Sequence, residues 1–285
     1  MSTLVPSFEF KLGSPICPGM VCAGKFDGAY PSLAAATPNG NVLLHDPRAS
    51  ANAIRTLSFG RSVRGLSCVP GAALVARKQQ QYPARADAND SGNRDVLLLG
   101  GDTCAHVFDV HTNSDAFFKD VPDGACCCAM GMMSIEAASS SSSSSSSEPV
   151  IVVGSNCSIQ GYTHDGTECF WTVSGDSVTC ITFAYLNTTF MLVGSKDCFV
   201  RVYSGEQLLH EISETAAPTC LKVVPKTSSS SSSSTQFDAC TWAYALENGT
   251  IGVYAPPLFP HRKNVTLCKN VTLCSATWAR SVCGA

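Results

Sequence analysis

Cysteines are the residues of this 285-residue chain that could most readily do chemistry, because 16 of them are present as potential metal ligands or redox thiols. Three of them, Cys126, Cys127 and Cys128, are consecutive. Zinc sites take cysteines from a spaced knuckle plus a second pair, whereas consecutive residues of a strand point to alternate faces and cannot all bind one ion. We interpret these three as small apolar residues of a crowded strand. Because the N-terminus lacks the pattern of a secretion signal, we expect all the cysteines to be reduced.

The remaining residues with chemical potential form no recognisable catalytic set. The segment Gly19–Phe26, GMVCAGKF, approaches a phosphate-binding loop, but Phe26 stands where that loop needs a Ser or Thr for Mg²⁺. We interpret it as a strand that ends in a turn at Asp27-Gly28. The six histidines are scattered, which favours surface or rim positions, and the three tryptophans are interpreted as packing anchors. No serine-hydrolase, zincin or kinase motif is found, so we predict a protein that is not an enzyme and needs no cofactor.

Charge and hydropathy exclude two further classes. The formal net charge is −3, the pI is about 6.0, and lysine and arginine do not cluster, so the electrostatic footprint of a nucleic-acid-binding protein is absent. No apolar run is long enough to span a bilayer as a helix. We expect no nucleic-acid partner and no transmembrane segment.

The elements that must position any site are repeated hairpins. An apolar run, a turn and an alternating apolar run recur from Leu33, Leu97, Ile151, Met191 and Ala243, which is the pattern of a β-hairpin. The residues that we expect to form the five turns, and that we commit to as structural site residues, are Asn39, Gly40, Gly101, Asp102, Ser155, Asn156, Lys196, Asp197, Asn248 and Gly249.

Each hairpin is flanked by further apolar runs, giving four strands at a period of roughly 40 to 55 residues, which is typical of a β-propeller blade. We therefore predict an all-β fold, a β-propeller of four-stranded antiparallel blades. Five blades are recognisable, and an incomplete seven-bladed ring is one interpretation of them. The chain is predicted to be a single domain over residues 1–285, with blades at about 18–60, 61–122, 123–174, 175–213 and 216–270.

Three low-complexity or polar segments, residues 77–94, 138–148 and 227–235, fall between the first and second strands of blades two, three and five. Poly-serine cannot bury apolar surface, so we expect disordered inserts on one rim. After Tyr254 no further blade hairpin follows. We therefore expect an open arc, or a ring with a gap between the first blade and Asn264–Ser281, with Ser7–Leu12 available as a last outer strand.

A family resemblance is carried by GSNCSIQGYTHDGTECFWTVSGDSV at Gly154–Val178, and continues through LVGSKDCFVRVY, YALENGTIGVY and FDGAYPSLAAATPNGNVLLHDP. These segments resemble the N-terminal propeller of the Bardet–Biedl syndrome 2 family, subunits of the BBSome, a coat-like complex that moves membrane proteins in cilia. The likeness covers most of residues 6–255 in order.

The resemblance implies a non-catalytic scaffold subunit of a BBSome-like complex, acting through protein–protein interaction in ciliary membrane-protein trafficking and cilium assembly. It implies other BBSome subunits as partners and ciliary cargo indirectly. It also implies a location in the cytoplasm at the cilium or flagellum, the basal body and the ciliary membrane periphery. The alternative that the residues leave open is a propeller enzyme or metal-dependent binding module with a site at the channel mouth, which would need converging carboxylates or histidines.

Overall fold

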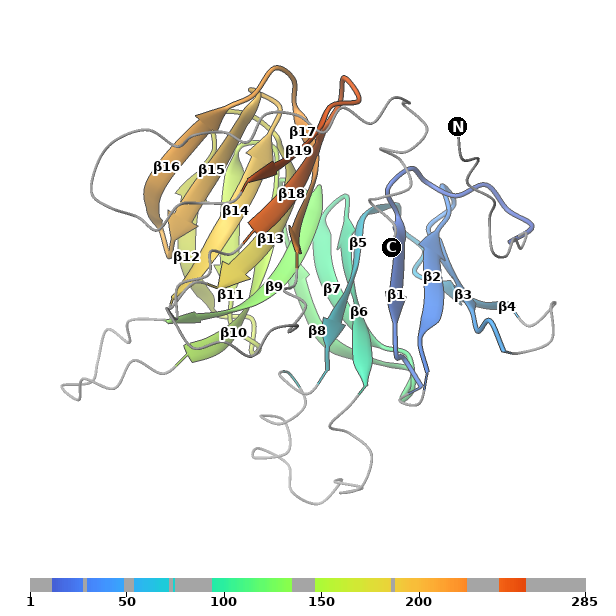
Figure 1. Cartoon of the computed structure of the whole chain (residues 1–285). Coiled ribbons are helices and arrows are strands. Elements are labelled where there is room, and N and C mark those ends of the chain that lie inside the picture. Colours follow the sequence, from blue (N-terminus) through green and yellow to red (C-terminus); the bar gives the residue numbers. More distant parts are fainter. Residues whose placement is uncertain are drawn as a thin grey trace, which may run out of the picture.

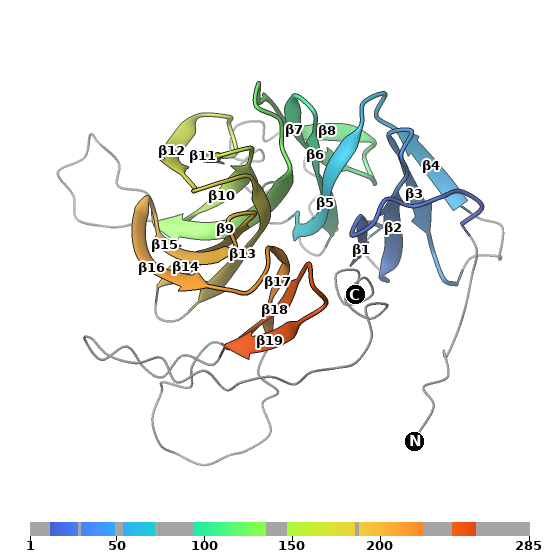
Figure 2. The same ribbon diagram turned by 90° about the horizontal axis from the view of Figure 1, so that it is seen from above.

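The computed structural model describes residues 12–27, 30–48, 54–71, 74, 94–134, 147–185, 188–224 and 241–254. The strands in these ranges form five antiparallel sheets (Figure 1). Seen from above, the sheets are arranged as blades around a common centre (Figure 2). The prediction of an all-β propeller with five recognisable blades is confirmed.

The blades are meanders, because each strand pairs with the strand next to it in the chain. In blades one to four all four strands are described, and in blade five three are described. From the inner to the outer strand, blade one has β1 (Val21–Gly24), β2 (Ser32–Ala36), β3 (Asn41–His45) and β4 (Ile54–Ser58), and blade two has β5 (Val63–Pro70), β6 (Asp95–Gly101), β7 (Cys104–Asp109) and β8 (Ser114–Asp120). Blade three has β9 (Cys127–Ser134), β10 (Ser147–Gly154), β11 (Ser158–Tyr162) and β12 (Glu168–Val173), blade four has β13 (Val178–Tyr185), β14 (Thr189–Ser195), β15 (Phe199–Ser204) and β16 (Gln207–Ser213), and blade five has β17 (Pro218–Val224), β18 (Thr241–Leu246) and β19 (Ile251–Tyr254).

The three predicted inserts lie almost wholly outside the described residues. Ser147 and Glu148, however, belong to β10, where they pair with the end of β9. The hairpin is therefore longer than the serine-rich composition suggested, and the predicted insert bound at residue 148 is wrong. Two segments were predicted to flank a gap in the ring, and they also lie outside the described ranges: residues 264–281, and residues 7–12 except Leu12. The assignment of the chain to a single domain stays a prediction.

A small residue recurs at one register position in the second strand of every blade. In blades two to five the residue pairs at this position, inner strand first, are Gly65 with Gly100, Cys127 with Gly154, Cys180 with Gly194, and Cys220 with Ala245. In blade one the equivalent residue is Ala36, whose N donates to Met20 O over 3.0 Å. A Cβ added to Gly154 would come within 2.6 Å of Val178 Cγ1 in the next blade, and one added to Gly194 within 2.8 Å of Pro218 Cβ. The missing side chains let successive blades approach closely near the axis.

Four hydrophobic clusters hold the blades together, and each joins two consecutive blades. Between blades two and three, for example, Leu98 and Val107 pack with Ile151 and Val153, all of them fully buried. The internal strands of blades two to four are covered by neighbouring blades on both faces, so they carry apolar residues on both faces. Within the described ranges, no such cluster joins blade five to blade one.

A candidate functional site at the mouth of the central channel

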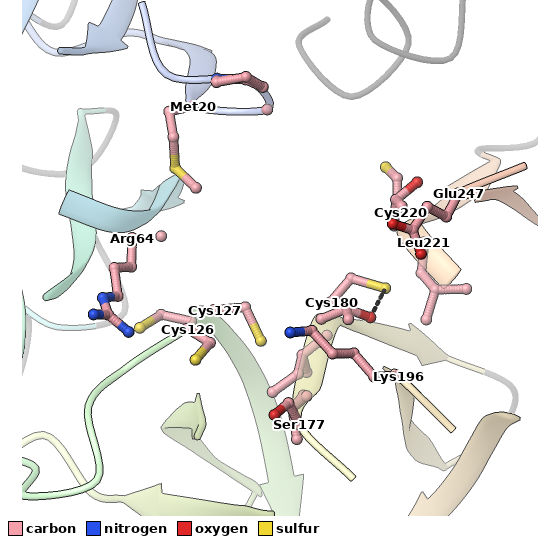
Figure 3. Close-up of a pocket in the computed structure, with 18 of the residues that line it drawn as sticks. Met20, Arg64, Cys126, Cys127, Ser177, Cys180, Lys196, Cys220, Leu221 and Glu247 are labelled. Carbon is pink, nitrogen blue, oxygen red and sulfur yellow. Dashed lines mark hydrogen bonds between the residues drawn. The ribbon is translucent and has the colours of Figure 1, made fainter. Parts of the chain in front are cut away.

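A concavity with a volume of about 860 Å³ lies on the propeller axis. All five blades line it, through the segment Pro18–Met20 before β1 and through β5, β9, β13 and β17 (Figure 3). Sites of small-molecule and peptide binding commonly have this size and position. We call this concavity, at the rim where the inner strands begin, the channel mouth.

Backbone hydrogen bonds fix the hairpin turns to the beginnings of the inner strands at this rim. Lys196 N donates to Ser177 O over 2.9 Å in blade four, and Glu247 N donates to Ala217 O over 2.9 Å in blade five. In the same way Val178 N donates to Ser155 O over 3.0 Å between blades four and three. The turn between the second and third strands therefore borders the channel mouth in these blades.

The ten turn residues predicted from the sequence all lie at or beside the connections between second and third strands. Four of them line the channel mouth, namely Asn156, Lys196, Asn248 and Gly249. Of the others, Asp102 accepts a hydrogen bond from the Ser62 hydroxyl and forms an ion pair with Arg64. Both interactions lower the pKa of Asp102. Gly40 and Gly249 have φ angles of +76° and +84°, a backbone conformation that favours glycine and suits a tight turn.

Three of the cysteines that line the channel mouth, Cys127, Cys128 and Cys180, have thiols with a raised pKa. Burial raises the pKa of both Cys128 and Cys180 to about 12, and raises that of Cys127 well above its ordinary value. Cys127 Sγ lies against Gly154 in its own blade, whereas Cys128 Sγ lies against Gly100 of blade two. The consecutive cysteines therefore face opposite sides, as predicted. Since the thiolate is the nucleophile and the metal ligand, a raised pKa disfavours the reactive form of these three thiols and supports their interpretation as packing residues.

The charged groups at the channel mouth are mostly cationic. Arg64, Lys196 and Lys222 line it, together with one carboxylate, Glu247. Arg64 and Lys196 reach toward Cys126 and Cys127 from different blades, whereas Glu247 lies on the side of blade five (Figure 3). Sequence reasoning missed this convergence, because the three cations are far apart in the chain and only the arrangement of the blades brings them together.

The described residues contain no group of three or more His, Cys, Asp or Glu side chains placed to hold a metal ion. The lining of the channel mouth carries a single carboxylate, that of Glu247, and no histidine. Its chemical character suits an extended or anionic ligand.

A second charged cluster, which sequence reasoning also missed, lies in blade four. The Arg201 side chain is 8% exposed, and it donates to Ser195 Oγ over 2.7 Å, to Asp197 Oδ2 over 2.6 Å and to Glu211 Oε1 over 2.7 Å. A Cβ on Gly175 would collide with Asp197 and with Arg201, so the cluster reaches the connection from blade three. Its position makes it structural. Two signals could have indicated this cluster. One is the spacing of four residues from Asp197 to Arg201, and the other is the pairing of Arg201 with Glu211 across β15 and β16.

Two expectations about aromatic and histidine residues need correction. His45 is buried, at 6% exposure, because it ends β3, a strand that is paired on both edges. It is therefore not a surface residue, although it stands at the end of a strand. Trp242 is buried and packs against Tyr254, but Trp171 is 52% exposed on the outer strand β12, which is paired on one edge only. Trp171 is not a packing anchor. The segment Gly19–Phe26 contains β1 followed by a turn, as predicted.

We compared the chain with family models and with known proteins. The family models described as "Ciliary BBSome complex subunit 2, N-terminal" and "Ciliary BBSome complex subunit 2, middle region" match residues 22–131 and 177–258. The BBSome complex member BBS2 of Danio rerio is 31% identical over 254 residues, and that of Homo sapiens is 32% identical over 265 residues. Each alignment covers 88% of this chain and 32% of the relative, so the chain spans about a third of the length of these relatives.

Solved structures support the fold. BBS1N, from a crystal structure in complex with ARL6DN, has a TM-score of 0.55 at 12% identity, covering 84% of this chain and 64% of that chain. Sqt1 of Saccharomyces cerevisiae has a TM-score of 0.56 at 13% identity, covering 85% of this chain and 60% of that chain. At these identities the likeness concerns the propeller alone. Among the described residues, no helix combines the length and the apolar character that a membrane span requires. The two family models and the shared identity lead to one conclusion, that this chain belongs to the family of ciliary BBSome complex subunit 2 and matches its N-terminal and middle regions.

Proposed function

We propose that this chain is a non-catalytic scaffold subunit of a BBSome-like complex that acts in ciliary membrane-protein trafficking and cilium assembly. The observation that carries the proposal is the alignment with BBS2 relatives over 88% of the chain. Its partners are other BBSome subunits, with membrane-protein cargo engaged indirectly. Its location is the cytoplasm at the cilium or flagellum, the basal body and the periphery of the ciliary membrane.

The surface supports a role in binding proteins. Trp171 and Val173 are 52% and 56% exposed, and because they stand two residues apart on β12 their side chains share one face. Leu208 and Leu209 on β16 are also large and exposed, at 44% and 40%. Aromatic residues are enriched at protein interfaces, and outer strands held by a packed blade present such groups on a rigid surface.

The alternative, an enzyme or a metal-dependent binding module at the channel mouth, receives less support. Such a site needs carboxylates or histidines converging from several blades. The lining residues instead supply three cations, one carboxylate and thiols whose pKa is raised. This composition favours binding over catalysis.

The test is recovery of partners from ciliated cells. An affinity-tagged form of the 285-residue chain is expressed, and the proteins that co-purify are identified by mass spectrometry. We expect BBSome subunits to be enriched over the affinity tag expressed alone, and more strongly than by a tagged Gly154→Val variant, whose blade packing is destabilised. If the folded chain enriches no BBSome subunit, the scaffold proposal is refuted.

A further inference from the structure

The electrostatic character of the channel mouth is opposite to that of the chain as a whole. Three cationic side chains and one carboxylate line it, whereas the formal net charge of the chain is −3. Walls of low dielectric constant concentrate the field of charges inside a cavity and attract ligands of opposite sign. The cavity is therefore prepared for an anionic ligand.

Carboxylates close to the channel mouth are already engaged with the protein. Asp102 accepts from Ser62 and pairs with Arg64, and Asp197 accepts from Ser195 and Arg201. Asp176 Oδ1 accepts from Ser177 N over 2.6 Å. Arg64 is thus partly neutralised by Asp102, and Lys196 and Lys222 are the other two cations of the lining.

The three cations come from three different blades. Arg64 begins blade two, Lys196 occupies a turn of blade four, and Lys222 lies within β17 of blade five. Lys222 stands three residues beyond Thr219, the first β17 residue to line the cavity, which places it about 10 Å deeper along the strand. It is close enough to Cys22 of blade one to lower the pKa of that thiol against the stronger effect of burial. An extended peptide with spaced carboxylates matches cations on three blades and at two depths better than one compact phosphate does.

The inner strands add a second form of recognition. Each inner strand pairs with its own blade along one edge only, so its other edge presents backbone donors and acceptors toward the axis. Hydroxyl groups of Ser177, Thr179 and Thr219 also line the cavity, although Thr179 Oγ1 donates to Pro218 O. An extended peptide offers the complementary backbone groups.

We propose that the channel mouth binds an extended acidic segment of a partner protein, with Lys196 and Lys222 as the main determinants. The inference names the chemistry of a partner and in that respect rests on the scaffold function proposed above. It concerns a site that is separate from the exposed side chains of β12 and β16.

The experiment measures binding of a fluorescein-labelled peptide of alternating glutamate and serine to the purified 285-residue chain by fluorescence anisotropy. A peptide of alternating glutamine and serine is the ligand control. Lys196→Glu and Lys222→Glu are compared with Lys25→Glu, which reverses an exposed charge outside the channel mouth. Lys196→Gln and Lys222→Gln provide milder variants, and circular dichroism verifies that each variant is folded.

We expect each channel reversal to weaken acidic-peptide binding about tenfold or more at low salt, with smaller losses for the glutamine variants and less than a twofold change for Lys25→Glu. An equal loss for Lys25→Glu, or no loss at the channel positions, would overturn the inference. So would displacement of the peptide by inorganic phosphate at a matched concentration of charge, because the site would then select small anions.

Failure of this inference can be told apart from failure of the scaffold proposal. If the purified chain binds no acidic peptide but still recovers BBSome subunits from cells, the inference is wrong and the scaffold function stands. If the peptide binds as expected but no BBSome subunit is recovered, the scaffold function is wrong, whereas the chemistry assigned to the channel mouth stands.

Discussion

Replacing Arg201 with methionine tests whether the charged cluster of blade four stabilises the propeller. Methionine keeps much of the length and apolar contact of the side chain while it removes all three donated hydrogen bonds, to Ser195, Asp197 and Glu211. The Asp197 side chain, 21% exposed, then loses its cationic partner. The hydroxyl of Ser195, a residue that is fully buried, still donates to Asp197 but has lost its donor.

The expected cost follows from the exposure of each partner. A hydrogen bond to a charged group contributes roughly 1.5 to 3 kcal/mol, and the break of a buried ion pair costs about 3 to 5 kcal/mol. Asp197 is partly exposed, so its share lies at the low end, and Glu211, at 43% exposure, adds less than about 1 kcal/mol. We expect Arg201→Met to lower the free energy of unfolding by about 3 kcal/mol, which corresponds to about 6 to 12 °C in the thermal midpoint.

The assay is urea unfolding at pH 7, followed by tryptophan fluorescence, combined with two double-mutant cycles. The cycle of Arg201→Met with Asp197→Asn should give a coupling energy of about 2 kcal/mol, and the cycle with Glu211→Gln less than about 1 kcal/mol. An Arg201→Met variant within about 0.5 kcal/mol of the parent, or equal couplings in the two cycles, would refute the reasoning from exposure.

Acid titration gives an independent reading of the same cluster. Burial alone would raise the pKa of Asp197, but hydrogen bonds from Arg201 and Ser195 outweigh it and hold the pKa below its ordinary value. The stabilisation is therefore complete above the unfolded pKa, about 3.9, and is lost as the pH falls through the folded value. The parent should lose more stability than Arg201→Met when the pH falls below about 4, and parallel losses would contradict this account.

Three further changes test the turns, the blade packing and the thiols. Gly40→Ala should cost at least about 2 kcal/mol in urea unfolding, and Gly249→Ala about 1 kcal/mol, because both have positive φ but only at Gly40 would the new Cβ collide, with Arg61 O; equal costs would argue against that collision. Gly154→Val should lower stability by about 2 to 3 kcal/mol, since the space is filled by Val178 and Cys127, and an unchanged thermal midpoint would show that the blades can separate without loss. Iodoacetamide at pH 7 should label the exposed Cys157 first and leave Cys180, whose pKa is raised to about 12, unlabelled until unfolding; mass spectrometry that finds Cys180 labelled early would contradict the burial.

Local patterns were enough to predict the blades. Asn39-Gly40 and Asn248-Gly249 mark hairpins because a tight turn needs residues that tolerate positive φ, and the repeat of the flanking strands fixed the order of the rest. The errors arise where exposure depends on the position of a strand within its blade. Tryptophan is usually buried and histidine is often exposed, but Trp171 is exposed and His45 is buried. The order of strands explains both, because Trp171 is on an outer strand and His45 is on an internal one.

The candidate site was less predictable than the fold. The turn positions of Asn156 and Lys196 could be predicted from short motifs, but their convergence on one cavity could not. Arg64 and Lys222 carry no local signal, since an isolated cation in a strand is ordinary. Their meeting depends on the angles between blades, which are set by packing between residues that are distant in the sequence.

The pattern of interblade clusters has a consequence for how the molecule opens. The clusters join blades one to two, two to three, three to four and four to five, so blades two, three and four each have two cohesive neighbours within the described residues, whereas blades one and five each have one. The stability of such a structure is described by the intrinsic stability of each blade plus the interfaces between consecutive blades, as in a linear repeat protein. Amide hydrogens of β9 and β10 should therefore exchange most slowly with solvent, and those of β1 and β17 should exchange through partial openings that leave the central blades intact.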